Sequence, residues 1–420
     1  MKDIDVINHL KFKISYGTYG NEALDLGSTN ANFYPTQNLY SVNNLNDAIS
    51  YSLFYIGNPE LTWEKSSMLN TGIDFGLWDD RFEGEVEFFK KRTTDMIFNK
   101  QVAISLGYAV LPVNDAVLDN AGFEFRFAGS PIKTSNFELK LNVNGAHYRN
   151  EILKMPMQGA SEKNFEEQGR FGWSKGHSIY DYYLREYAGV DSNTGQSQWY
   201  VYYDNNNLDE DTNEPTRVTN MVEYLAQRKE ADADVDLEKD VTYKYADATL
   251  NYVGKSAIPD LTGAFGFDLK YRGFDLSAQF IYGLGGYGYD AVYAQLMHNS
   301  NVGSMNWHKD MEQRWTAPGQ TTVVPRLSAT YDTYVVSTSS RFLTSMNYIG
   351  LNNVRLGYTF PKKWLEKVKV NKLSAWVSGD NLFMSTARKG YYPIGDESGL
   401  SGRSQYIPLS TVMGGINIQF

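Results

Sequence analysis

Hydrophobic and polar residues alternate along much of this chain, with the two-residue period of a β-strand. In 69–77, Leu69, Ile73 and Phe75 fall on one face and Asp74 falls on the other. About ten segments share this pattern, which predicts an all-β protein. Besides 69–77, the clearest segments are 82–88, 121–127, 137–144, 261–270, 274–282, 354–360 and 411–420.

The links between these segments alternate between short and long. In an up-and-down antiparallel sheet, successive connections lie at opposite ends, so all short turns should fall at one end and all long loops at the other. This asymmetry is typical of an outer-membrane β-barrel, with short periplasmic turns and long external loops. The short links are 79–80, 129–135, 272–273 and 361–370, and the long ones are 18–65, 92–116, 150–260, 284–345 and 384–410.

Strands with one apolar and one polar face occur in two kinds of fold. A soluble β-sandwich buries Phe123, Phe125 and Phe127 against a facing sheet, whereas a membrane barrel turns them outward to lipid. The predicted strands run to roughly 9–14 residues, which exceeds the usual soluble length of about 5–6 and matches the about 9–11 that cross a bilayer. The pattern therefore favours a transmembrane β-barrel over the sandwich.

Composition agrees with this choice. The 420 residues are 42% hydrophobic with a mean hydropathy of −0.45, and no run approaches the ~18 apolar residues of a membrane helix. Barrel strands show only every second residue to lipid, so their average hydropathy stays low. Aromatic residues reach 15%, which fits girdles at the membrane interfaces and aromatic external loops. The net charge of −10 argues against a nucleic-acid partner.

Charged residues on the polar strand faces are the candidates for lining a wet lumen: Asp74, Glu83, Glu85, Glu87, Glu124, Arg126 and Lys140. An alternative is a secreted glycosidase, which would need Glu83 or Glu85 in a closed cleft with a second carboxylate about 5–10 Å away. The aromatic external-loop candidates are Trp173, Trp199 and Tyr200, which either stack on a ligand or pack within the loops. No catalytic, cofactor or metal motif is expected; the glycine motif of 283–288 follows an alternating strand, which argues against a dinucleotide site.

Several segments, taken together and in order, resemble SusC/RagA-type TonB-dependent transporters of Bacteroidota. They are NPELTWEK (58–65), NTGIDFG (70–76), FKKRTTD (89–95), NAGFE (120–124), YAGVD (187–191), PDLTGAF (259–265), GFDLS (273–277), LGYTFP (356–361) and SGDNLF (378–383). The terminal Phe420 is similar to the C-terminal aromatic residue that directs barrel assembly in this family.

The resemblance implies a 22-stranded barrel with a plugged lumen, of which this chain, 1–420, matches only the C-terminal part. We therefore expect about ten strands, with the signal peptide, the TonB-contacting segment and the plug absent. The implied function is part of an outer-membrane importer of oligosaccharides or peptides in a Gram-negative, Bacteroidota-like cell. A SusD-like surface lipoprotein and the TonB complex would be its partners, and no enzymatic activity is implied. The alternative function is that of a soluble carbohydrate-binding β-sandwich.

Overall fold

Ten long strands form one antiparallel sheet in which the strands pair in chain order. The computed structural model describes residues 6–21, 34–45, 48–108, 110–157, 164–299, 303, 305–328, 334–366, 370–394, 400–401 and 407–420. The predicted partial barrel wall of about ten strands is confirmed, and its two edges, β1 and β22, do not pair with each other. The strands are β1 (Ile7–Asn21), β4 (Glu64–Leu77), β5 (Phe82–Gln101), β6 (Val110–Lys133), β7 (Phe137–Lys154), β16 (Leu261–Tyr271), β17 (Phe274–Leu284), β20 (Tyr348–Thr359), β21 (Lys372–Thr386) and β22 (Thr411–Gln419).

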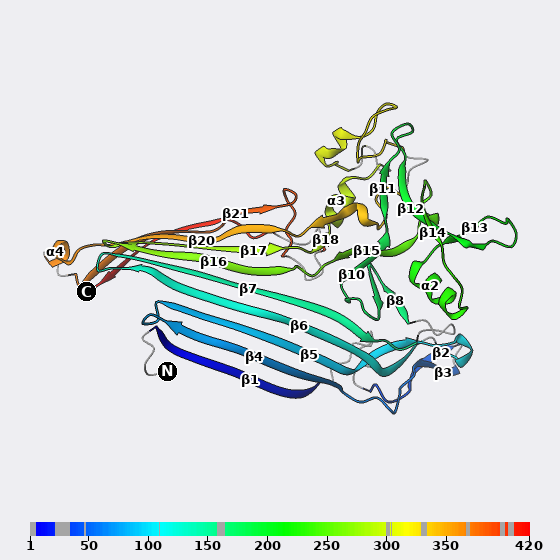
Figure 1. Ribbon diagram of the computed structural model, residues 1–420, viewed down its shortest axis with the longest axis horizontal. Helices are drawn as coiled ribbons and strands as arrows, with labels where there is room; N and C mark the ends of the chain where they lie inside the picture. The colour runs from blue at the N-terminus through cyan, green and yellow to red at the C-terminus, as the bar shows by residue number, and fades with distance from the viewer. Residues whose placement is uncertain are drawn as a thin grey trace.

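Short turns and long connections lie at opposite ends of the sheet, as predicted (Figure 1). Strand β1 begins and strand β22 ends at the turn end, where the link between β20 and β21 holds the short helix α4 (Lys362–Leu365) (Figure 1). The β16–β17 turn is tight because Arg272 and Gly273 both have positive φ, at 45° and 90°. Only glycine adopts the second conformation without strain, so this turn depends on Gly273.

One of the predicted long loops is wrong in extent. The 92–116 connection is mostly strand, because β5 continues to Gln101 and β6 already begins at Val110. The alternation breaks at Asp95, whose positive φ of 55° and local register shifts form a β-bulge. A bulge interrupts the two-residue pattern without ending the strand, so the sequence pattern ended the strand too early. The 129–135 turn is likewise shorter, since β6 continues to Lys133.

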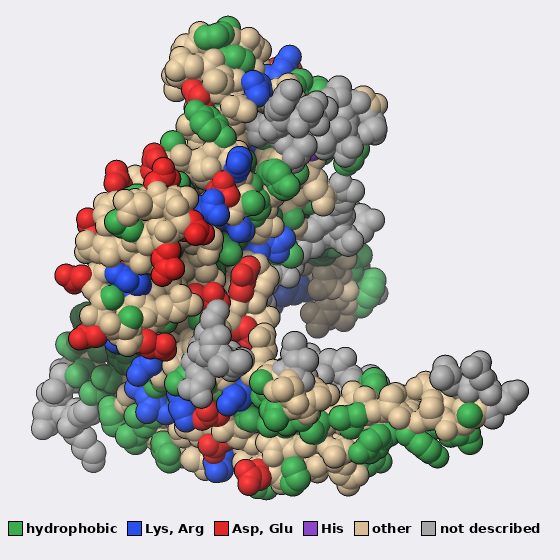
Figure 2. Space-filling view, turned by 90° about the vertical axis from the view of Figure 1, so that its right-hand side faces the viewer, with side chains coloured by type: hydrophobic (Ala, Val, Ile, Leu, Met, Phe, Trp, Pro, Cys, Tyr) green, Lys and Arg blue, Asp and Glu red, His purple; other side chains and the backbone are tan. Residues whose placement is uncertain are grey.

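The apolar face of the sheet is exposed. Phe12 and Ile14 of β1 are both 68% exposed, and Ile416 of β22 is 71% exposed. Seen from the loop end, hydrophobic side chains gather along the lower margin of the molecule (Figure 2). Soluble monomers rarely expose an apolar surface of this extent, whereas lipid covers it in a barrel.

The exposure of three aromatic side chains distinguishes the barrel from the sandwich. Phe123 and Phe125 are half-buried and Phe127 is exposed, and they stack along one face of β6, with ring centroids 6.5 Å and 5.6 Å apart. The β-sandwich alternative, which buries all three, is therefore wrong for this sheet.

The long connections fold into smaller elements beyond the end of the wall. Among the described residues, no helix is long and apolar enough to cross a membrane. The strands of these connections are β2 (Leu39–Leu45), β3 (Ala48–Tyr55), β8 (Phe165–Gln168), β9 (Phe171–Ser174), β10 (Asp181–Arg185), β11 (Tyr187–Val190), β12 (Ser197–Leu208), β13 (Pro215–Val218), β14 (Leu237–Thr242), β15 (Leu250–Ser256), β18 (Tyr287–Tyr289) and β19 (Leu343–Ser345). The helices are η1 (Ile104–Leu106), α2 (Met221–Glu230), η2 (Tyr245–Asp247), α3 (Ala291–Leu296), η3 (Lys309–Gln313) and η4 (Ser340–Phe342).

Candidate functional site

The predicted lumen residues of the first strands lie side by side on the polar face of the sheet. Asp74 is opposite Glu85, which in turn is opposite Arg126 on β6. Glu83 and Glu87 flank Glu85 on the same face of β5. The registers therefore bring together Asp74, Glu83, Glu85, Glu87, Glu124 and Arg126.

Lys140 extends this polar face to the next strands. It lies on β7 opposite Asp268 of β16, on the same face as Asn142 and Asn144. Arg126 of β6 is the register partner of Asn144. The seven predicted residues thus belong to one continuous polar face that covers β4 to β7, and whether they contact a ligand stays a prediction.

Ion pairs neutralise part of this face. Glu85 pairs with Lys13 of β1, and its other carboxylate oxygen lies 3.6 Å from Nη2 of Arg126. The glycosidase alternative needs Glu83 or Glu85 in a closed cleft, but Glu83 is exposed and Glu85 is only half-buried, at an open depression of the sheet. A shallow depression forms where Glu85, Glu87 and Glu124 meet Asn144 and Thr262.

Glu87 and Glu124 face each other directly across β5 and β6. Like charges in opposed positions destabilise a strand pair by about 0.2–1 kcal/mol. We therefore expect Glu124→Gln to raise the thermal midpoint of unfolding slightly. Glu83→Gln is the matched control, because Glu83 lies opposite Gly76 and Ala128. Circular dichroism melting of both variants tests this, and equal midpoints would contradict it.

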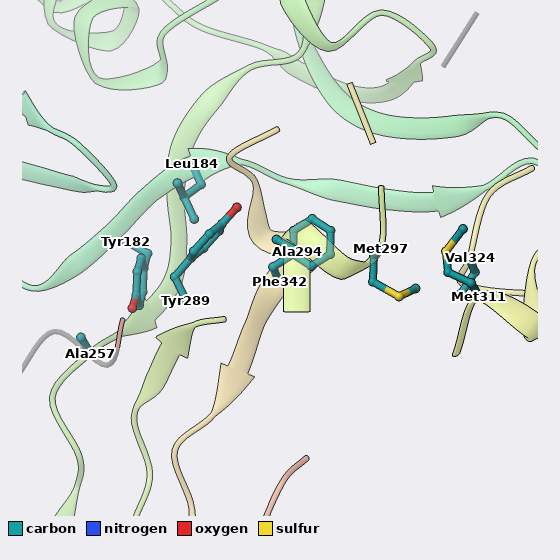
Figure 3. Packing of buried hydrophobic residues seen from close by; sticks show 9 residues of the cluster. All are labelled: Tyr182, Leu184, Ala257, Tyr289, Ala294, Met297, Met311, Val324 and Phe342. Carbon is teal, nitrogen blue, oxygen red and sulfur yellow. The ribbon is translucent and has the colours of Figure 1, made fainter. Parts of the chain in front are cut away.

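Two of the external connections share a hydrophobic core (Figure 3). Tyr182 and Leu184 come from the 150–260 connection, whereas Tyr289, Met297 and Phe342 come from 284–345. All five side chains are at most 4% exposed. The two connections therefore pack into one unit rather than extending separately into solvent.

A buried carboxylate joins a third connection to this unit. Asp290 is fully buried and caps helix α3 by accepting a hydrogen bond from the amide of Tyr293 at 3.0 Å. Arg388 of the 384–410 connection donates to it from Nε at 2.7 Å and also from Nη2. Ser401 Oγ donates to the other carboxylate oxygen at 2.7 Å. One aspartate thus ties 384–410 to 284–345.

The three predicted loop aromatics have different environments. Trp199 is only 2% exposed, and the centre of its ring lies 6.2 Å from that of Tyr187 and 5.6 Å from that of Tyr245. This agrees with the alternative that Trp199 packs within the loops. Trp173 is half-buried and donates from Nε1 to the carbonyl of Ile179. Tyr200 is also half-buried, and the Nζ atom of Lys239 lies 3.5 Å from the centre of its ring. Trp173 and Tyr200 thus keep some surface for a ligand, whereas Trp199 does not.

A second buried carboxylate, Asp204, organises the loop sheet around β12. Burial alone would raise its pKa, but hydrogen bonds from the Tyr224 hydroxyl and from the backbone amides of Asp236 and Asn206 lower the pKa below its ordinary value. The Arg228 guanidinium, 3.2 Å away, acts in the same direction. The charged form is therefore the one that the folded loop stabilises.

This lowered pKa predicts acid sensitivity of the loop sheet. Because the folded-state pKa lies below the unfolded value of about 3.9, the stabilisation is complete above that pH and disappears as the pH falls through the folded-state pKa. We expect Asp204→Asn to be less stable than wild type at neutral pH and to lose little more in acid. Tryptophan fluorescence of denaturant titrations at several pH values tests this, with Asp240→Asn, an exposed carboxylate of the same sheet, as control. A parallel loss of stability in wild type and Asp204→Asn would contradict it.

Within the described residues, no group of three or more His, Cys, Asp or Glu side chains is arranged to hold a metal ion. The glycines of 283–288 form no dinucleotide site, because β17 pairs antiparallel with both β16 and β20. Gly285 and Gly286 instead have positive φ in the turn between β17 and β18.

No family model matches the chain. Among curated proteins it is 26% identical to TonB-dependent receptor P39 of Formosa agariphila and 24% identical to TonB-dependent receptor SusC of Bacteroides thetaiotaomicron. Both alignments cover 100% of this chain but only 41% and 38% of the relatives. Among solved structures, the RagAB peptide transporter matches with a TM-score of 0.75 and 25% identity, over 100% of this chain and 42% of the other.

The sheet and these matches define the class: the chain has the fold of the barrel portion of TonB-dependent receptors and is similar to them over its whole length. More narrowly, it is similar to SusC and to the RagAB transporter, which agrees with the SusC/RagA-type motifs in its sequence. It spans about two fifths of the length of the curated relatives that it matches.

Proposed function

We propose that this chain supplies the C-terminal barrel wall and the external loops of an outer-membrane importer of oligosaccharide or peptide nutrients. The observation that carries the proposal is the two-faced sheet, whose polar and apolar faces run through ten strands with every long connection at one end. A sheet with these faces fits a wet lumen on one side and lipid on the other.

The polar face supports a role in solute passage. The wall around Glu85 mixes carboxylates, Arg126 and amides such as Asn144, which can exchange hydrogen bonds with a passing polar solute. Trp173 and Tyr200 in the loops would contact substrate or a partner that covers the barrel. Transport rather than catalysis is the proposed activity, since the relatives are named receptors and transporters.

The partners that we propose follow from the same similarity. A SusD-like surface lipoprotein would cover the external loops, and the TonB complex would supply the energy for import. The solved RagAB structures are described as peptide transporters or importers, which supports peptides as one of the two substrate classes. The outer membrane of a Gram-negative, Bacteroidota-like cell is the proposed location.

Fractionation and uptake in cells that carry the gene test this function. We expect the protein in the outer membrane, resistant to alkaline extraction and co-purifying with a surface lipoprotein. Deleting the gene should abolish growth on at least one peptide or glycan as the sole nutrient, and disrupting TonB should have the same effect. A protein in the soluble fraction, or growth unchanged on every such nutrient, would overturn the proposal.

A further inference from the structure

Two arginines of the external loops have no carboxylate partner. Arg170 lies in the β8–β9 turn with its guanidinium 4.3 Å from the ring centre of Tyr289, and Arg185 ends β10 with its guanidinium 4.7 Å from that of Tyr245. Neither forms an ion pair with any described residue. Both residues are half-buried, and the Nε atom of each is buried without a hydrogen-bond partner.

The two arginine–tyrosine pairs converge on one short segment. The Tyr245 hydroxyl donates to the carbonyl of Thr338 at 2.7 Å, and the Tyr289 hydroxyl interacts with the Thr338 side chain. Arg185 forms an isolated β-bridge with Ser339, the next residue. The two arginine–tyrosine pairs therefore lie beside one segment, residues 338–339, at the junction of the 150–260 and 284–345 connections.

The carboxylates next in sequence to Arg185 and to Tyr289 are already engaged. Glu186, the neighbour of Arg185, accepts a hydrogen bond from Lys239 at 3.0 Å. Asp290, the neighbour of Tyr289, binds Arg388. The chain has 49 acidic and 39 basic residues, so its carboxylates outnumber the arginine and lysine side chains with which they could pair. Two partly desolvated arginines left without one form a site that an external anion would complete.

We propose that Arg170 and Arg185 bind a carboxylate group of a peptide substrate. This rests on the proposed function and narrows its substrate class. A guanidinium presents a planar fork of donors that matches a carboxylate with two parallel hydrogen bonds, and the tyrosine rings hold each fork in place by cation–π contact.

The environment of the rings favours a peptide over an acidic glycan. Sugar-binding sites need free aromatic faces, but Tyr245 has Arg185 over its ring and Tyr334 stacked against it at 5.6 Å with an interplanar angle of 9°. Arg170 likewise lies over Tyr289, which is itself only 4% exposed. The rings thus orient guanidinium groups rather than offer a platform for a sugar.

Titration calorimetry on the whole protein, extracted in detergent from its membrane, tests the site. The probes are a short glutamate-rich peptide, the same peptide with glutamines and an amidated C-terminus, and oligogalacturonate. We expect the acidic peptide to bind at least about tenfold more tightly than the amide peptide. Arg170→Gln and Arg185→Gln should each weaken acidic-peptide binding by about tenfold, and Arg185→Lys, which keeps the charge but loses the fork, by less.

Arg217→Gln is the matched control, because this loop arginine already pairs with Asp247 at 2.7 Å and should leave binding unchanged. Thermal melting checks that each variant is folded. Equal binding of both peptides, or binding unaffected by Arg170→Gln and Arg185→Gln, would overturn the site while leaving the uptake result intact. Arginine-dependent binding of oligogalacturonate without binding of the acidic peptide would overturn the peptide assignment. Failure of the uptake experiment instead contradicts the function itself.

Discussion

Replacing Asp290 with alanine is expected to loosen the external loops while the barrel wall stays folded. The substitution leaves Arg388 without its carboxylate in a site where that side chain is only 19% exposed. Removing one partner of a buried ion pair costs about 3–5 kcal/mol. This loss of stability affects the loops, because Asp290 connects helix α3 with Arg388 and Ser401 and contacts no strand of the wall in these interactions.

Hydrogen exchange measured by mass spectrometry reads out this loosening segment by segment. Exchange in α3 and in 387–392 should rise by about a hundredfold, the equivalent of about 3 kcal/mol, while the interior of β5 and β6 stays protected. The matched control is Asp247→Ala, which breaks the more exposed pair with Arg217, worth about 0–1 kcal/mol. Unchanged exchange in α3 would show that Asp290 does not hold the loops together.

The wall was predictable from the sequence because each strand shows the alternation of apolar and polar residues within its own segment. The alternation of Phe274, Leu276 and Phe280 with Asp275 and Ser277 fixes the faces of β17 without reference to any other strand. The order of strands also followed, since up-and-down connectivity leaves only neighbours in sequence to pair. The error at 92–116 arose where one residue, Asp95, leaves the two-residue period at a bulge.

The loop unit was predictable only in fragments. Residues 289–297 have the composition of a helix, and an aspartate just before α3 is a usual N-cap signal. Nothing local shows that Arg388, 98 positions away, would bind that aspartate. Arg170 and Arg185 were missed for the same reason. They stand out because no carboxylate of the described residues forms an ion pair with them, and the sequence does not show which residues are neighbours in space. Trp199 resembled a ligand contact because its burial depends on Tyr245, which lies in another part of the chain.

Replacing Val143 with arginine is expected to destabilise the protein strongly in the membrane. Val143 lies in the interior of β7, on the apolar face, paired with Phe127 on one side and Phe265 on the other. A charged side chain on the lipid face of a barrel costs about 2–4 kcal/mol near the bilayer midplane. The same residue in a soluble sheet with this face in water would cost far less.

The adjacent position provides the control. Asn142→Arg places the same side chain one residue earlier, on the polar face between Ala128 and Gly266. We expect it to leave the urea midpoint of unfolding in lipid vesicles nearly unchanged, whereas Val143→Arg lowers the midpoint and reduces the heat-modifiable folded band on a gel. The comparison holds strand, depth and charge constant and varies only the face. If Asn142→Arg were the more damaging change, the assignment of lipid and lumen to the two faces would be reversed.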